Sequence, residues 1–469
     1  MADSRLRSGL AALDEVLGGG LPAHGITLIM GLPGSGKTIL AQQYAFHNAD
    51  PEHPVVYFST LSEPMEKIVR FGQTLDFFDA SAVGKSVFYE DLGQAASGGG
   101  GLGAVGEQVA DTLKRRHPGL IIIDSFKALR PFADTGAAYR RFLNQLAGRM
   151  TAFPAASMWI GEYEPGDAAL LPEFAIADAI VDMGTTRAGQ RDMRYLEVRK
   201  LRGSGFRSGQ HGYRLSQRGL HLFPRLADVP MDESYALGSQ RVASGVSGLD
   251  TMLAGGLWPG AATLIAGPSG AGKTVLGLHF IRAGTAIGEP GVIASLQENP
   301  SQLSRMIAGF GWPANDPAIE IMYRSPVDIY IDEWVYDLLH TIERTGARRV
   351  LVDSLLDLQM AAPDDTRFRE FMYSLSQRLS RQGISLLMTT EVPELFGTHR
   401  LSEFAGSHLA DNVIMLSYFR DQGQVKRAMS VVKTRASSHD PAVREFAISS
   451  TGISIRDAIT ATEPLGVGP

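Results

Sequence analysis

Two glycine-rich segments of the sequence carry the residue types that bind phosphate. Residues 31–38 read Gly-Leu-Pro-Gly-Ser-Gly-Lys-Thr and residues 267–274 read Gly-Pro-Ser-Gly-Ala-Gly-Lys-Thr, so both match GxxxxGK(S/T). Glycines let such a loop curl until successive backbone N–H groups face one anion, and the helix that follows adds the positive end of its dipole. The alternative, a chance glycine loop, is disfavoured by the second match. The sequence therefore predicts two ATP sites.

Within each segment the lysine and the threonine have separate expected roles. Lys37 and Lys273 would neutralise charge on the β- and γ-phosphates and so contribute to catalysis, and Thr38 and Thr274 would offer a hydroxyl to Mg²⁺. The residues expected to contact nucleotide are Gly34, Ser35, Gly36, Lys37 and Thr38 in the first loop and Ser269, Gly270, Ala271, Gly272, Lys273 and Thr274 in the second.

An aspartate ends a short apolar run downstream of each loop. Asp124 follows Leu-Ile-Ile-Ile and Asp353 follows Val-Leu-Val. An aspartate at the carboxyl end of a buried strand can hold Mg²⁺ through water, so Asp124 and Asp353 join the two threonines as expected magnesium residues. An ordinary strand-end acid is an equally good interpretation of either run taken alone.

The chain is an internal duplication. Lys37 recurs as Lys273 and Pro64 as Pro300, each at an offset of 236 residues. So long a period indicates two whole domains. The expected division is a first domain at residues 1–228, a linker at 229–241 and a second domain at 242–469.

Short apolar runs alternate with helical segments in both halves. Runs such as 26–30, 120–123, 263–266 and 350–352 contain only apolar residues or threonine, as expected for strands buried on both faces. The alternation predicts an α/β fold with a mostly parallel sheet flanked by helices. The glycine-rich stretch 97–103 is expected to be a flexible surface loop.

Composition excludes several classes of protein. The chain of 469 residues has a formal net charge of −6 and no cysteine, which disfavours a nucleic-acid or anionic-membrane partner and removes disulfides and thiolate metal sites. The N-terminal residues lack an apolar signal core, and no apolar run is long enough to span a bilayer. A cytoplasmic location is expected.

The sequence resembles the KaiC family of tandem RecA-like P-loop ATPases. The resemblance covers about residues 5–456 and is carried by the paired loops and by motifs at residues 18–22, 254–257, 288–292, 388–391, 200–203 and 427–435. It implies a double-ringed homohexamer with ATP between neighbouring subunits. A KaiB-like partner is compatible with it, whereas the short segment after residue 456 argues against a KaiA-type activator.

The resemblance also assigns roles to residues outside the loops. It implies that Lys200, Leu201 and Arg202 reach the nucleotide of the next subunit in one ring, that Lys433, Thr434 and Arg435 do so in the other, that Phe310 packs on the second adenine, and that Arg427 lines that site. The alternatives are a solvated strand face for the Lys-x-Arg pairs, a core aromatic for Phe310 and a surface charge for Arg427.

The sequence departs from the family where two adjacent glutamates are expected after the second strand. The first half has Leu61 and Ser62 there, with Glu63 one place later, whereas the second half keeps one acid, Glu298. Glu298 is therefore the expected general base, and the first site is expected to hydrolyse ATP slowly, to use Glu63, or only to hold ATP. Glu63 is equally well an acid near a helix start.

The family's autophosphorylated Ser-Thr pair is also incomplete. Ser407 is retained and His408 replaces the threonine, so serine autokinase activity at Ser407 is expected only as an alternative to an ordinary hydroxyl. The leading hypothesis is an ATP-hydrolysing hexamer used in signalling or timing. The other two are a nucleic-acid-dependent ATPase and a scaffold that ATP assembles with little turnover.

Overall fold

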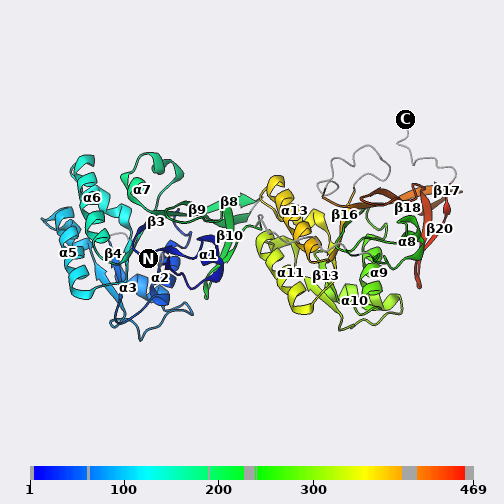
Figure 1. Cartoon of the computed structure of the whole chain (residues 1–469), viewed down its shortest axis with the longest axis horizontal. Helices are drawn as coiled ribbons and strands as arrows, with labels where there is room; N and C mark the ends of the chain where they lie inside the picture. Colours follow the sequence, from blue (N-terminus) through cyan, green and yellow to red (C-terminus); the bar gives the residue numbers. More distant parts are fainter. Residues whose placement is uncertain are drawn as a thin grey trace. The chain divides into compact units, whose positions relative to one another are not determined.

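The computed structural model describes residues 5–60, 64–188, 191–226, 238, 240–392 and 409–459. The chain divides into two compact units, Met1–Arg225 and Leu226–Pro469 (Figure 1). Each unit is a layered α/β domain, and the predicted class of two tandem RecA-like domains with mostly parallel sheets is confirmed.

The helices of the first unit are α1 (Ala11–Val16), α2 (Lys37–His47), α3 (Met65–Gly72), α4 (Gly93–Ser97), α5 (Gly101–Arg116), α6 (Gly136–Thr151) and α7 (Pro172–Ile176), with 3-10 helices η1 (Phe126–Phe132) and η2 (Pro165–Ala169). Its strands are β1 (Arg5–Leu6), β2 (Leu21–Pro22), β3 (Ile26–Met30), β4 (Val55–Ser59), β5 (Val87–Asp91), β6 (Leu120–Asp124), β7 (Ala156–Gly161), β8 (Ala179–Ala188), β9 (Arg191–Leu201), β10 (Gln210–Ser216) and β11 (Gly219–Phe223).

The helices of the second unit are α8 (Ser247–Met252), α9 (Lys273–Thr285), α10 (Pro300–Gly309), α11 (Ile331–Thr345), α12 (Leu355–Ala361) and α13 (Asp365–Arg381), with the 3-10 helix η3 (Pro326–Asp328). Its strands are β12 (Ala262–Gly267), β13 (Gly291–Ser295), β14 (Ile319–Tyr323), β15 (Arg349–Asp353), β16 (Ser385–Glu391), β17 (Asn412–Asp421), β18 (Gln424–Thr434), β19 (Arg444–Ser449) and β20 (Gly452–Ala458).

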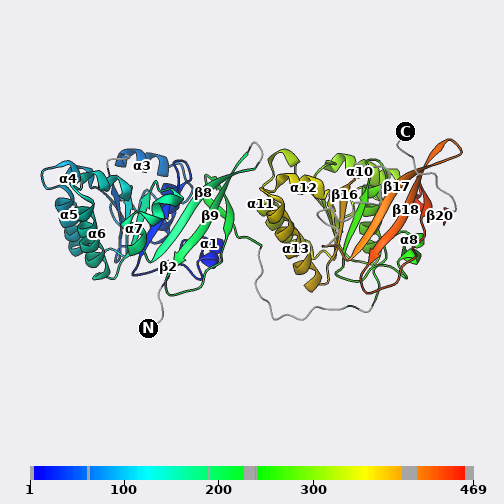
Figure 2. The ribbon, with the colours of Figure 1, turned by 90° about the horizontal axis from the view of Figure 1, so that it is seen from above.

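Both units have the same sheet. The first has the order β11-β10-β9-β8-β3-β7-β6-β4-β5 and the second β14-β13-β15-β16-β12-β17-β18-β19-β20. In the first sheet the strands that lie between β5 and β8 in this spatial order, ends included, are parallel, and in the second sheet the same holds from β14 to β17. The remaining strands of each sheet form an antiparallel extension. Figure 2 shows the long pairs β8–β9 and β17–β18 that begin these extensions.

Apolar residues on both faces of the strands explain the layering. Along β3, Ile29 faces a core with α1 and α2, whereas Leu28 and Met30 face the opposite core with α5 and α6. In β12, Ile265 packs toward α9 while Leu264 packs toward α11 and α13. Side chains alternate between faces of a strand, so a strand covered on both sides must be apolar throughout.

The expectation of a flexible loop over the whole of residues 97–103 is wrong, since only residues 98–100 lie between helices α4 and α5. Helix α5 begins at Gly101, and Leu102 is buried together with Val105 and Val109. These apolar residues recur at helical spacing, so packing against the sheet outweighs the low helix propensity of glycine. No helix in the described ranges combines the length and apolar character needed to cross a bilayer.

A buried arginine fixes the start of the second unit. Arg349 of β15 is 1 % exposed, and it donates to the carbonyl oxygens of Ala243 and Phe280, each at 2.8 Å, and to Glu289 Oε2 at 2.8 Å. A Cβ at Gly284 would lie 2.5 Å from the arginine side chain, so glycine is required there. In the first unit Asn48, which corresponds to Gly284, donates to the Arg7 carbonyl at 2.9 Å instead.

The two units also hold their last hairpin differently. The backbone N–H of Leu220 donates to Gln43 Oε1 at 3.2 Å in the first unit, and that of Ile453 donates to His279 Nε2 at 3.2 Å in the second. Gln43 and His279 are related by the 236-residue offset. The same hydrogen bond therefore depends on a titratable side chain only in the second unit.

We predict that His279→Gln reduces the loss of stability of the second unit at acidic pH. Burial lowers the pKa of His279 below its usual 6.5, opposed by a backbone hydrogen bond with Gly245. A depressed folded-state pKa contributes stability that is complete above about pH 6.5 and is lost as the pH falls through the folded value. Urea unfolding followed by tryptophan fluorescence between about pH 7.5 and 5 measures this, and Trp312, whose ring centroid lies 4.8 Å from that of His279, is one of the four tryptophans that contribute to the signal.

His47→Gln is the matched control, because His47 lies exposed at the end of α2. Its pH dependence should equal that of the unsubstituted chain. The prediction would be contradicted if the stability of His279→Gln depended on pH in the same way as that of the unsubstituted chain.

Candidate functional site

Each predicted phosphate loop joins a central parallel strand to a helix. Residues 31–36 connect β3 to α2, and residues 268–272 connect β12 to α9, so each helix begins at the loop lysine. Gly36 and Gly272 precede the helices with φ of +89° and +106°, a left-handed conformation that favours glycine. A Cβ at Gly36 would also lie 2.6 Å from Leu215 of β10, so the turn has no room for a side chain.

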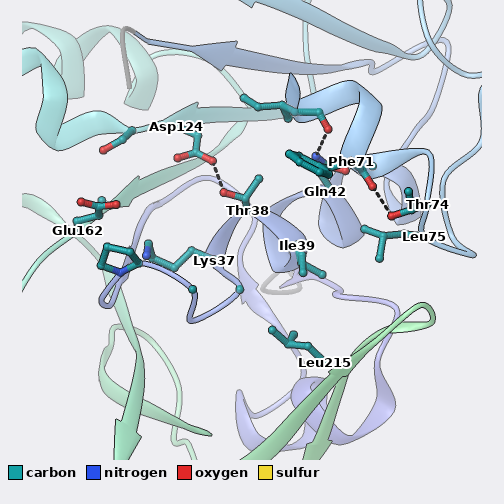
Figure 3. A pocket seen from close by; sticks show the side chains of 17 residues that line it. Lys37, Thr38, Ile39, Gln42, Phe71, Thr74, Leu75, Asp124, Glu162 and Leu215 are labelled. Atoms are coloured by element: carbon teal, nitrogen blue, oxygen red, sulfur yellow. Dashed lines mark hydrogen bonds between the residues drawn. The ribbon is translucent and has the colours of Figure 1, made fainter. Parts of the chain in front are cut away.

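The loop threonine contacts the strand-end aspartate in both units. Thr38 Oγ1 donates to Asp124 Oδ2 at 2.8 Å, and Thr274 Oγ1 donates to Asp353 Oδ2 at 2.7 Å (Figure 3 shows the first pair). The four residues predicted to hold magnesium therefore form two equivalent pairs at the carboxyl ends of the parallel strands. That edge is where ligands bind in open α/β sheets.

These oxygen pairs fit Mg²⁺ by the chemistry of their donors. Magnesium is usually held in proteins by a few oxygen ligands together with phosphate oxygens and water. Among the described residues no group of three His, Cys, Asp or Glu side chains could hold a metal ion alone. The hydroxyl and carboxylate would thus hold the ion only together with the phosphates of a nucleotide.

A second hydroxyl contacts each aspartate, and it comes from a different strand in each unit. Tyr57 of β4 donates to Asp124 Oδ2 at 2.7 Å, whereas Thr389 of β16 donates to Asp353 Oδ1. Sequence reasoning missed both contacts. They join residues 67 and 36 positions apart, and neither hydroxyl was assigned a role, although Thr389 lies within the motif at residues 388–391.

Lys37 is buried and Lys273 is partly buried, and both lysines are bound to their own loops. Lys37 Nζ donates to the Leu32 carbonyl at 2.9 Å, and Lys273 Nζ donates to the carbonyls of Gly267 and Pro268 at 3.0 and 2.9 Å. Burial lowers the pKa of both lysines, opposed chiefly by Glu162 for Lys37 and by Glu391 for Lys273. An anionic ligand is the natural partner for such a lysine.

The first site opens into a pocket with a volume of about 620 Å³. Lys37, Thr38, Asp124 and Glu162 lie at its polar end, and Ile39, Phe71, Leu75 and Leu215 lie at its apolar end, as Figure 3 shows. This gradient suits a molecule with a polyanionic head and a flat, less polar base.

Glu162 is a pocket residue that sequence reasoning did not assign. It follows β7, the strand between β3 and β6, and Lys127 of η1 donates to its carbonyl oxygen at 2.7 Å and to Asp167 at 2.9 Å. Glu391 occupies the equivalent position at the end of β16. An acid at the end of a strand-like run in both halves, after Ile-Gly in the first and after Thr-Thr in the second, was the signal that could have identified it.

The second site contains Glu298 in the turn between β13 and α10. Its Oε2 is buried without a hydrogen-bond partner among the described residues. Burial raises the pKa of Glu298, and so do Asp353 and Asp357, while Lys273 and a backbone hydrogen bond lower it. Glu63 and Ser407 lie outside the described residues.

The remaining predicted loop residues lie where the motif places them. Ser35 is buried, and its carbonyl accepts a hydrogen bond from Tyr213 at 2.5 Å. Arg427 of β18 donates to the Gly270 carbonyl at 3.4 Å. Tyr418 donates to the Ser269 carbonyl at 3.3 Å. The other loop members are Gly34, whose φ is +78°, and Ala271, which is fully buried.

Phe310 lies at the end of α10 in an aromatic cluster. Its ring centroid is 5.0 Å from that of Trp312 and 6.0 Å from that of His279. It corresponds by the 236-residue offset to Thr74, which lines the first pocket. The position therefore fits both the predicted contact with adenine and the alternative of a core aromatic.

The contacts described for the two Lys-x-Arg segments are with residues outside the loops of their own units. Lys200 Nζ donates to the Phe174 and Ala175 carbonyls at 3.3 and 3.4 Å, and Arg202 pairs with Asp178 at 3.1 Å. The side chain of Leu201 between them is buried in the core.

The second segment repeats this arrangement. Lys433 donates to the Ala410 carbonyl at 2.8 Å, and Arg435 pairs with Asp411 at 3.5 Å. Thr434 Oγ1 donates to the Ser437 carbonyl at 2.8 Å.

Two glycine loops, each with a hydroxyl–carboxylate pair at the carboxyl edge of a parallel sheet, define a tandem P-loop nucleotide-binding protein. The family model "ATPase: KaiC" matches residues 6–227 and, a second time, residues 242–459. The chain therefore belongs to the KaiC ATPase family.

Similar full-length proteins are named circadian clock oscillator protein KaiC. The proteins of Picosynechococcus sp. and Rippkaea orientalis are 27 % and 28 % identical to this chain. Each alignment covers 97 % of this chain, and it covers 90 % of the first relative and 89 % of the second. That of Synechococcus elongatus is 26 % identical, with 97 % and 90 % coverage.

We predict that Thr38→Val and Thr274→Val each weaken Mg-ATP binding at the altered site by about tenfold or more. Each change removes a hydroxyl next to a carboxylate, a contact of the size of a hydrogen bond to a charged group. Titration with ATP in the presence of Mg²⁺ and again in EDTA measures how much Mg²⁺ increases the affinity for ATP. Thr74→Val, at the apolar end of the first pocket, is the matched control. The assignment of the threonines as magnesium residues would be contradicted if Thr74→Val lost the increase in ATP affinity with Mg²⁺, or if Thr38→Val kept it.

Proposed function

We propose that this protein binds ATP at both loops, hydrolyses it mainly at the second, and assembles as a homohexamer with nucleotide between subunits. The observation that carries the proposal is a hydroxyl–carboxylate pair next to the loop lysine, which occurs once in each unit. The names of its relatives support a role in timing or signalling of the circadian clock type. A KaiB-like partner stays a prediction from family resemblance.

Glu298 is the proposed general base of the second site. Its carboxylate accepts a proton from water as the water oxygen attacks the γ-phosphorus and ADP leaves. A base is most effective when its pKa approaches the working pH, and burial moves the pKa of Glu298 in that direction. Lys273 holds the phosphates in place, and Mg²⁺ when bound neutralises part of their charge.

The first site is proposed to bind ATP and to cleave it more slowly. The residues that would match the family's acid pair, together with Glu63, lie outside the described part of the chain. Glu162 has a counterpart, Glu391, in the second unit, so it does not distinguish the sites. The ranking of the two sites by their rate of hydrolysis rests on Glu298, a carboxylic acid near the second loop whose pKa is raised by burial.

The hexamer is supported by the Lys-x-Arg segments. Lys200 and Arg202 in one unit, and Lys433 and Arg435 in the other, are held by backbone carbonyls and aspartates away from the loops of their own units. A cation supplied by a neighbouring subunit can stabilise charge on a transferring phosphate. The proposal therefore places them against the nucleotide of the next subunit.

The basic runs give no support to a nucleic-acid-dependent ATPase. Arg115 and Arg116 both pair with Glu90, at 3.1 and 3.0 Å, and Arg116 also stacks over the Phe88 ring at 3.6 Å. Arg349 is the buried arginine described above. A phosphate-binding surface needs exposed, uncompensated cations.

We predict that Lys273→Ala and Glu298→Gln abolish most steady-state ATPase activity, whereas Lys37→Ala retains most of it. Loss of a general base lowers turnover by about 10²–10⁴-fold. Glu320→Gln is the control, since Glu320 lies on the edge strand β14 and pairs with Arg344 of α11. A Lys273→Ala protein that keeps most of the activity would reverse the ranking of the sites. ATP-dependent assembly with no phosphate release over hours would favour the scaffold.

We predict that native mass measurement shows six copies with Mg-ATP and smaller species without it.

Intact-mass measurement after incubation with Mg-ATP then tests the autokinase. A phosphate added to the unsubstituted chain and absent from Ser407→Ala supports transfer of the γ-phosphate to the Ser407 hydroxyl in a neighbouring subunit. The same phosphate on Ser407→Ala excludes that residue, and a nucleotide-independent monomer excludes the ring.

A further inference from the structure

A closed triangle of side chains links two turns of the second site. Asp357, in the first turn of α12, accepts hydrogen bonds at its Oδ2 from Gln297 Nε2 at 3.0 Å and from Ser354 Oγ at 2.6 Å. Gln297 Nε2 also lies 3.4 Å from Ser354 Oγ. The three side chains therefore contact one another directly.

The triangle joins the two turns that carry the site's acids. Gln297 precedes Glu298 in the turn between β13 and α10, and Ser354 follows Asp353 at the end of β15. The backbone N–H of Leu296 also donates to the Asp353 carbonyl at 2.7 Å, and the triangle adds side-chain hydrogen bonds to this link. Shifts of about 1 Å in a catalytic group can cost a factor of 10² in rate, so this link bears directly on the placement of Glu298.

Among the described residues of the first unit, the equivalent point of the helix carries no carboxylate. Ala128 corresponds to Asp357 by the offset that relates Asp124 to Asp353. There the two turns are connected through Thr60, whose Oγ1 donates to the Ser125 carbonyl at 3.1 Å and accepts from the Ser125 N–H at 3.0 Å. A carboxylate at this point of the helix is thus specific to the second site.

The triangle also accounts for the missing acid. Gln297 stands where the family resemblance places the other member of the acidic pair, and its amide donates to a carboxylate that comes from another element. Asp357 thus adds a carboxylate near Glu298, besides that of Asp353. The negative charge of Asp357 adds to that of Asp353 in raising the pKa of Glu298, and Lys273 opposes both.

We propose that Asp357 is a positioning residue of the second site, which fixes the Glu298 turn through Gln297 and Ser354 and supplies the charge that Gln297 lacks. The inference rests on the proposed function of Glu298.

The test measures kcat and KM for ATP on the full-length protein, with the activity left in Glu298→Gln subtracted as the contribution of the first site. Asp357→Ala is expected to lower kcat about tenfold or more with KM within about twofold, since positioning affects the transition state more than binding. Asp357→Asn keeps a carbonyl acceptor but loses the charge, and kcat is expected to fall here too.

Exchange of donor and acceptor provides the rescue. In Gln297→Glu combined with Asp357→Asn, the asparagine amide donates to the new carboxylate, so the triangle again holds one charge. This double variant is expected to recover most of the kcat lost in Asp357→Asn, which a merely structural role would not predict. Asp365→Ala is the matched control, since Asp365 accepts the same kind of bond from Gln359 at 2.9 Å on an exposed surface.

Several outcomes would overturn the inference. They are an unchanged kcat in Asp357→Ala or Asp357→Asn, an effect confined to KM, an equal loss in Asp365→Ala, and a double variant no better than Asp357→Asn alone. If Glu298→Gln itself leaves ATPase activity intact, the proposed function fails. If Glu298→Gln is inactive and Asp357→Ala is not, only the role of Asp357 fails.

Discussion

The hydrogen bond from the loop threonine to the strand-end aspartate is the contact on which both sites depend. Thr38 belongs to the helix after β3 and Asp124 ends β6, yet β7 lies between these strands in the sheet. The contact therefore spans the end of an intervening strand, and it forms only if three parallel strands end at one level. Glu162 follows that intervening strand, which is why an acid lies beside the loop lysine.

The fold and the centre of each site could be predicted from sequence because their causes are local. Strands buried on both faces must be apolar throughout, and a phosphate loop needs glycines such as Gly36 at fixed spacing. The partners of the aspartates could not be predicted in this way. Tyr57 and Thr389 hold Asp124 and Asp353 from different strands, so the duplication itself does not reveal them. Asp357 has no counterpart in the first half, and only the packing of α12 against β16 and its neighbours brings it beside Gln297.

The surroundings of the two loops are unequal although the loops themselves are alike. After β6 the first unit places Lys127, which ties down the segment that carries Glu162, and after β15 the second places Asp357. One site thus receives a cation and the other a carboxylate one residue further along the same helical turn. Equal phosphate binding with unequal proton transfer is the expected consequence, and a ring built from such subunits would use the two nucleotides for different purposes.

Gly284 has a consequence for how a duplicated chain reaches its native state. Two halves with the same sheet order risk exchanging elements during folding, a recognised failure of tandem proteins. If α2 docked on the second sheet in place of α9, Asn48 would occupy the position of Gly284. Its Cβ would then meet Arg349, which three hydrogen bonds hold in place. Such a clash would disfavour docking of the helix of the first half on the second sheet.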